Sequence, residues 1–211
     1  MNKVRFRYVK EGKAKYISHL DLMSTLQRSF RRAGIDLKYS EGFNPHPYMS
    51  VALPLSVGCE SVCELIDVSL AGIAIPDISR LELPEGLSVV DAYTPLRSFN
   101  DIVWIEIIAE LQYTDEAANH YADRLRCCLN KDIIVISKRT KRGYKDIDIA
   151  PFIKDAEIIA GRQTLFKAKI SAQNPTINTS DLLNVFDEEI KPENIDIRRV
   201  EIYDRNMIIF K

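Results

Sequence analysis

The order of the expected strands and helices constrains the fold of this chain most, because the same order occurs twice. Val4, Phe6 and Tyr8 alternate with Arg5 and Arg7, the period of a half-buried strand. Further elements of the first half are expected at 19–33 (helix), 36–40, 49–53 and 62–70 (strands), 77–83 (helix) and 87–93 (strand). In the second half they are expected at 103–112 (strand), 114–129 (helix), 133–138, 144–149, 157–160 and 165–171 (strands), 179–190 (helix) and 196–203 with 207–210 (terminal hairpin). We therefore predict an α+β protein of two ferredoxin-like, or split βαβ, domains in tandem, with antiparallel sheets and helices packed on one face.

The segment 94–101 (TPLRSFND) separates the two halves, because proline and polar residues interrupt the periodic pattern there. We predict one domain at 1–95, with a basic helix and a proline-flanked loop, and a second at 101–211, with the terminal hairpin. In a chain of 211 residues, each half is long enough to bury a core of its own.

Composition favours a cytoplasmic protein. Hydrophobic residues make up 46% and charged residues 28%, a globular balance. No apolar run approaches the roughly 20 residues that span a bilayer, and the first seven residues do not form a signal-peptide core. We expect the four cysteines to be buried small hydrophobic residues, and we predict neither a metal nor a cofactor.

Charge is unevenly distributed along the sequence. Residues 1–50 hold ten Lys and Arg against four Asp and Glu, whereas residues 51–100 hold two against seven. A positive first quarter suits an anionic partner such as RNA. The acidic stretch 60–91 leaves open a different interpretation, in which it docks a basic protein.

The predicted helix at 19–33 begins after Ser18 and ends before Gly34, and it has two distinct faces. At 100° per residue His19 begins the apolar stripe, which predicts a histidine packed at the edge of the core. The opposite face carries three arginines, and two lysines precede the helix; all five are candidate phosphate contacts: Arg28, Arg31, Arg32, Lys13 and Lys15. A solvated face is the alternative.

The loop 41–48 (EGFNPHPY) contains two prolines, which cannot donate to a sheet ladder, so we expect it to stand out from the sheet in a stiff conformation. Phe43, Asn44 and His46 offer an aromatic ring, an amide and an imidazole, groups that can stack on a base and bond its edge. The alternative is a rigid connector with Phe43 in the core.

A second basic run, residues 138–145, lies between two predicted strands. Its cations include three candidate RNA contacts, Arg139, Lys141 and Arg142. Such runs usually form a solvated hairpin tip. If the two halves face each other, this tip would instead extend the basic helix face into a groove.

Three sequence blocks, 16–23 (YISHLDLM), 31–34 (RRAG) and 39–47 (YSEGFNPHP), resemble the uncharacterised radical SAM-associated protein family, the stand-alone form of a domain also found fused to radical SAM proteins. The resemblance extends through 53–58 (LPLSVG) and 141–149 (KRGYKDIDI) to most of the chain. It implies a functional partnership with a radical SAM enzyme. A looser, fold-level similarity is to CRISPR-associated repeat-processing proteins, which also pair ferredoxin-like domains and handle RNA.

The sequence thus favours a non-catalytic RNA-binding or substrate-presenting accessory protein that works with a radical SAM enzyme. A second hypothesis is a metal-independent ribonuclease with His46 and His19 as acid and base, together with Tyr39. A third is a protein-only scaffold for the radical SAM partner. Binding is preferred over catalysis, and whether the chain is an enzyme stays open.

Overall fold

The computed structural model describes residues 2–113, 118–140, 143–161, 163–178, 181–182, 185–186 and 191–211. The chain divides into two compact units, Met1–Asp101 with Lys211 (unit 1) and Ile102–Phe210 (unit 2). Each described strand pairing within these units is antiparallel, and each unit has one described α-helix. The predicted α+β class is therefore confirmed, in a form dominated by sheet.

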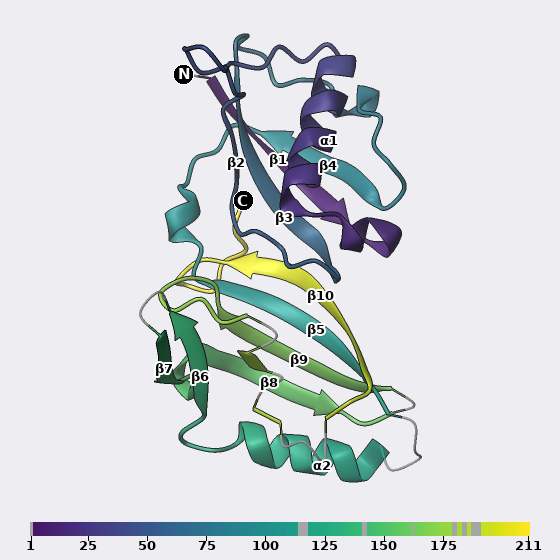
Figure 1. Ribbon diagram of the computed structural model, residues 1–211, viewed down its shortest axis with the longest axis vertical. Helices are drawn as coiled ribbons and strands as arrows, with labels where there is room; N and C mark the ends of the chain where they lie inside the picture. Colours follow the sequence, from purple (N-terminus) through teal and green to yellow (C-terminus); the bar gives the residue numbers. More distant parts are fainter. Residues whose placement is uncertain are drawn as a thin grey trace. The chain divides into compact units, whose positions relative to one another are not determined.

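Unit 1 is a sheet in the order β4-β1-β3-β2, with α1 across one face (Figure 1). Its elements are β1 (Asn2–Lys10), α1 (His19–Arg32), β2 (Met49–Val51), β3 (Cys59–Leu70) and β4 (Leu87–Tyr93), with short 3-10 helices at Gly12–Tyr16, Ile78–Arg80 and Phe99–Asp101. The order places the first strand of the chain in the interior of the sheet.

The alternation along β1 decides which side chains form the core of unit 1. Val4, Phe6 and Tyr8 are buried in one cluster with Leu26 and Phe30 of α1. The rings of Phe6 and Phe30 pack with their centroids 4.8 Å apart. Since successive residues of a strand point to opposite faces, Lys3, Arg5 and Arg7 of β1 lie on the face away from α1.

Local signals set both ends of α1 where the sequence predicts them. The side chain of Ser18 accepts a hydrogen bond from the amide of Asp21 at 3.2 Å, so it caps the first turn. At the other end Gly34 adopts a φ of +76°, a conformation that glycine adopts readily. The amide of Ile35 then donates to the carbonyl of Phe30 at 2.9 Å, the closing bond of a Schellman motif.

The second helix predicted for the first half does not form. Residues 77–83 contain only the three-residue 3-10 helix Ile78–Arg80. Pro84 disfavours helical geometry at the residue before it, and the carbonyl of Glu82 is instead held by the Ser29 hydroxyl and the Arg32 guanidinium at 2.8 and 2.9 Å. With this helix missing, the tandem of ferredoxin-like domains is not confirmed.

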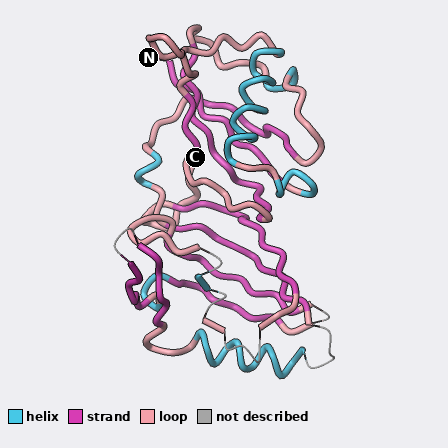
Figure 2. The backbone as a smooth tube through the Cα atoms, viewed as in Figure 1, coloured by secondary structure: helices cyan, strands magenta, loops and turns pink. Residues whose placement is uncertain are grey.

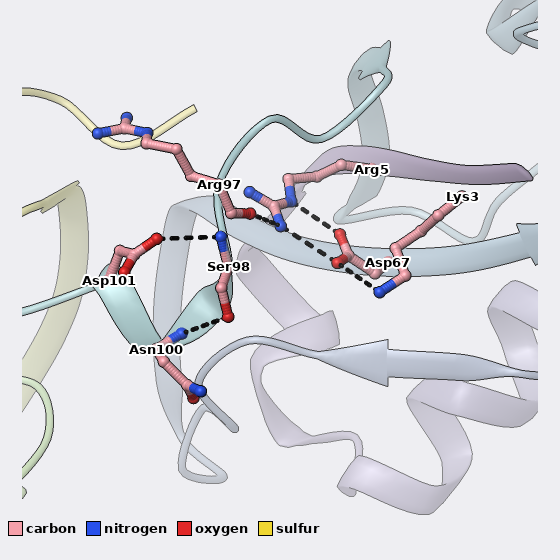
Figure 3. A network of polar contacts seen from close by, with 7 residues as sticks. All are labelled: Lys3, Arg5, Asp67, Arg97, Ser98, Asn100 and Asp101. Atoms are coloured by element: carbon pink, nitrogen blue, oxygen red, sulfur yellow. Dashed lines mark hydrogen bonds and ion pairs between the residues drawn. The ribbon is translucent and has the colours of Figure 1, made fainter. Parts of the chain in front are cut away.

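Residues 94–101, predicted as a linker, lie against the polar face of the unit 1 sheet, and we call them the strap (Figure 3). The guanidinium of Arg5 donates to the carbonyl of Arg97 at 2.9 Å and stacks 4.3 Å from the ring centroid of Phe99. The amide of Ser98 donates to the carboxylate of Asp101 at 3.1 Å, and the strap ends in a 3-10 turn. The strap is therefore fixed to β1.

Unit 2 pairs its main strands in the order β10-β5-β9-β8, and β6 and β7 form a separate hairpin (Figure 2). Its elements are β5 (Trp104–Gln112), α2 (Ala118–Leu129), β6 (Val135–Thr140), β7 (Gly143–Asp148), a 3-10 helix (Ala150–Phe152), β8 (Ile153–Ile159), β9 (Thr164–Ser171) and β10 (Asn194–Tyr203). Arg126 ties α2 to β8 by donating to the carbonyl of Ile158 at 2.7 Å. Most of the predicted helix at 179–190, and the start of that at 114–129, lie outside the described residues.

Two smaller expectations fail in the described chain. Cys63 and Cys128 are buried as predicted, but Cys127 is exposed on α2. The second arm of the terminal hairpin contributes only an isolated bridge between Tyr203 and Ile209, so 207–210 is not a strand. Among the described helices, none has the length and apolar character that crossing a membrane requires.

Candidate nucleic-acid interface

The exposed side of α1 carries the first part of the candidate site. Leu22, Leu26 and Phe30 face the sheet, so the helix turns Arg28 and Arg31 outward, where both are exposed. Both lie in the second half of the helix, near its negative dipole end. The predicted polar and basic face is therefore present on the surface of unit 1.

The loop after α1 forms a projecting arm, residues 37–48. Tyr39 bridges Pro47 across the arm, and the flanking bonds run from the amide of Ser40 to the carbonyl of His46 at 2.8 Å and from Tyr48 to Lys38 at 2.9 Å. Pro47 has no amide hydrogen, and it fits this position because the amides of Ser40 and Tyr48 donate the flanking hydrogen bonds. The Ser40 hydroxyl also accepts from the amide of His46 at 2.9 Å, which closes the arm below its tip.

The tip of the arm presents its side chains to solvent. Phe43 is fully exposed, with a relative accessibility of 107%, and Asn44 and His46 are also exposed. The alternative in which Phe43 anchors a connector in the core is wrong, because the bonds that close the arm hold its tip away from the sheet. An aromatic ring, an amide and an imidazole are therefore available together.

Tyr39 joins the arm to the helix. The Arg31 guanidinium lies 5.7 Å from the centroid of the Tyr39 ring, and the Gln27 amide is 3.5 Å from its hydroxyl. These contacts place the base of the arm beside the second half of α1. We call Arg28, Arg31, Phe43, Asn44 and His46 the basic-aromatic surface.

Arg32 has a structural bond that distinguishes it from the other two arginines. It is exposed, yet its guanidinium donates to the carbonyl of Glu82, as described above. Replacing Arg32 would loosen the segment that takes the place of the missing helix. Arg28 and Arg31 are therefore better probes of ligand binding.

Lys13 and Lys15 lie at the opposite end of α1 from the arm. Both belong to the 3-10 helix Gly12–Tyr16; Lys13 is exposed, and the ammonium of Lys15 lies 5.4 Å from the ring centroid of Tyr16. The 14 residues of α1 span about 21 Å, so the structure does not gather these lysines with the basic-aromatic surface. The predicted cations instead extend along the length of the helix.

The prediction that His19 packs at the edge of the core is wrong, because His19 is exposed in the first turn of α1. The helical phase is right, but within α1 the residues of the core cluster begin at Leu22, one turn after His19. Gln27, which contacts the arm, is about 12 Å further along the helix. The structure therefore does not bring His19 to the arm that carries His46, as an acid-base pair would require.

The second predicted basic site falls largely outside the described part of the chain. Lys141 and Arg142 lie outside the described residues, as does the side chain of Arg139, whose backbone belongs to β6. The neighbouring Lys138 pairs with Asp181 at 3.0 Å and also donates to the carbonyl of Thr176.

The acidic stretch 60–91 is not one continuous surface. Glu64 and Asp67 are buried, and Glu60 accepts from the amide of Gly12 at 2.9 Å. Burial lowers the pKa of Lys10, while the nearby Glu64 carboxylate opposes that shift. Several of these acidic side chains are thus buried or hydrogen-bonded within unit 1. Among the described residues, no three His, Cys, Asp or Glu side chains group in a way that suits a metal ion.

Residues 3–181 match the family described as "Uncharacterized protein conserved in bacteria (DUF2344)", and the chain belongs to this family. That description names no radical SAM partner. No curated protein matches the chain. One similar solved structure is "Structure of Thermus Thermophilus Cse3 bound to an RNA representing a pre-cleavage complex", with 12% identity, 92% of this chain and 98% of that chain covered, and a TM-score of 0.20. An overlap this low bears on neither fold nor function.

Proposed function

We propose that unit 1 binds unpaired RNA through the basic-aromatic surface, and that the chain acts as a non-catalytic, cytoplasmic accessory protein. The observation that carries this proposal is the fully exposed ring of Phe43 at the tip of a closed arm. An aromatic ring held in water is a surface on which nucleic-acid binders stack bases.

The two kinds of side chain divide the recognition between them. Arg28 and Arg31 offer guanidinium forks that bond phosphate oxygens in pairs. Phe43 offers a face on which a base stacks, an interaction of about 1–3 kcal/mol. Asn44 and His46 add hydrogen-bonding groups for a base edge. This division predicts affinity for single strands over duplexes, whose bases are already stacked.

The most specific test replaces Phe43 with alanine and measures the affinity for a labelled single-stranded RNA by fluorescence anisotropy. Loss of one stacked base should weaken binding by about five- to 150-fold. Ile73→Ala is the matched control, because Ile73 is another large exposed hydrophobic residue of unit 1, with an accessibility of 93%. Equal affinities of Phe43→Ala and the wild type would rule out the stacking role.

A radical SAM enzyme enters this proposal as the partner that receives the RNA, and the sequence resemblance of 16–23, 31–34 and 39–47 is its support. The test is co-purification of the tagged full chain from bacterial lysate, with and without nuclease. Retention of a radical SAM protein after nuclease treatment indicates direct contact, and retention only before it indicates bridging by RNA. Absence of any radical SAM protein in both samples would contradict the partnership.

A further inference from the structure

A cavity lies in unit 1 on the face of the sheet away from α1, separate from the basic-aromatic surface. It is a cavity of about 640 Å³ between the edge of the sheet and the strap, and its lining includes Lys3, Ser50, Asp67, Leu96, Phe99 and Asn100. A smaller cavity of about 270 Å³, lined by Pro47 and Tyr48 at the base of the arm, shares Lys3, Ser50 and Asp67 with it. The large cavity is within the size range of small-molecule sites, about 300–1,000 Å³.

Asp67, which lines this cavity, forms an ion pair with Arg5 on the neighbouring strand (Figure 3). The Arg5 guanidinium bonds both oxygens of Asp67, at 2.7 and 3.1 Å. Both residues are buried, with accessibilities of 1% and 6%. Since Arg5 balances the charge of Asp67, the carboxylate contributes little net negative charge to the cavity.

Lys3 is a third charged residue, beside this ion pair. Its ammonium lies 3.8 Å from the nearer Asp67 oxygen, beyond hydrogen-bond distance, and its side chain is 51% exposed. The ammonium therefore does not spend its donors on a hydrogen bond to Asp67. Among the described residues that line the cavity, Asp67 is the one acid, and Arg5 already balances its charge, so the Lys3 ammonium gives the site an excess of positive charge.

We propose that this cavity binds a nucleotide through its phosphate, supplied either by a free nucleoside monophosphate or by the 5′ end of an RNA strand. Lys3 neutralises the phosphate, and the Ser50 hydroxyl and the Asn100 amide lie in the same lining to bond its remaining oxygens. Leu96, which is 93% exposed, and Phe99 supply an apolar wall for the base. A ligand with both an anion and a planar ring matches this lining better than a simple inorganic anion.

The site uses none of the residues of the basic-aromatic surface, so the two proposals fail independently. The first measurement is calorimetric titration of the full chain with AMP and with adenosine. AMP should bind and adenosine should bind at least tenfold more weakly, because a charge-assisted bond to the phosphate is lost. Lys3→Ala should weaken AMP binding by tenfold or more. Ser50→Phe should block the cavity by bulk while leaving Lys3 in place.

Lys131→Ala is the control, since Lys131 is an exposed lysine of unit 2, and it should leave AMP binding unchanged. The second measurement compares a 5′-phosphorylated RNA with the same RNA ending in a hydroxyl. Lys3-dependent AMP binding identifies the free nucleotide as the source, and a Lys3-dependent preference for phosphorylated RNA without AMP binding identifies the strand end. If neither the phosphate nor Lys3 changes affinity in either measurement, the proposal is overturned.

Discussion

The ion pair of Arg5 and Asp67 links β1, β3 and the strap of unit 1. Arg5 comes from β1 and Asp67 from β3, and the same guanidinium holds the carbonyl of Arg97 in the strap. A buried charge that loses its counter-charge is strongly destabilising, whereas an exposed, loosely held charge contributes little. The pair therefore has a structural role that Lys3, its half-exposed neighbour, does not share.

Replacing Asp67 with asparagine should consequently lower the free energy of unfolding of unit 1 by about 3–5 kcal/mol, because the Arg5 charge stays buried without a carboxylate. Urea unfolding followed by circular dichroism measures this change. Lys3→Ala, the matched change at the exposed end of the same network, should cost less than about 1 kcal/mol. Similar losses in the two variants would show that the pair does not hold the strap.

At the scale of elements, the end of α1 determines where the arm begins. Gly34 has a positive φ, and among the described residues nothing lies within 4 Å of the position that a Cβ would take. The cost of a side chain at Gly34 is thus a backbone cost alone. Gly34→Ala should lower the free energy of unfolding by about 1–2 kcal/mol.

The control for this substitution is Ser24→Ala at an exposed position inside α1, where alanine favours the helix. Thermal unfolding of both variants checks the comparison, with Gly34→Ala melting below the wild type and Ser24→Ala at or above it. A Gly34→Ala variant as stable as the wild type would mean that the Schellman closure is dispensable.

The sequence predicts those elements that short-range signals determine. Ser18 and Gly34 predict the two ends of α1 correctly, because each acts within one helical turn. The exposure of His19 was not predictable from helical phase, since it depends on how far the core cluster extends under the first turn. The helix expected at 77–83 does not form, partly because Pro84 opposes it and partly because Ser29 and Arg32, distant in sequence, bond the carbonyl of Glu82.

The cavity between the sheet edge and the strap was not predicted from the sequence, for a similar reason. Lys3, Ser50, Asp67 and Phe99 come from two strands of the sheet, its edge strand and the strap, and only the strand register brings them together. The alternation of charged with apolar residues on β1 was the available signal. It indicates a polar face, but not what covers that face.

At the scale of the whole molecule, a formal net charge of −1 conceals a divided distribution. Of the cations in the first fifty residues, Arg5 and Lys10 are buried, whereas Arg28 and Arg31 face solvent. The RNA binding that we propose for unit 1 therefore depends on where the cations lie, not on their number. Binding of this kind weakens as salt rises, because each cation in contact with a phosphate releases counterions.

The salt dependence of RNA affinity tests whether the basic-aromatic surface contacts RNA phosphates. Anisotropy titrations of single-stranded RNA at several salt concentrations give a slope of log affinity against log salt, and Arg28→Gln with Arg31→Gln should reduce its magnitude by about one to two. Arg205→Gln, an exposed arginine of unit 2, should leave the slope unchanged. A double variant that keeps both the affinity and the slope of the wild type would contradict RNA binding at the basic-aromatic surface.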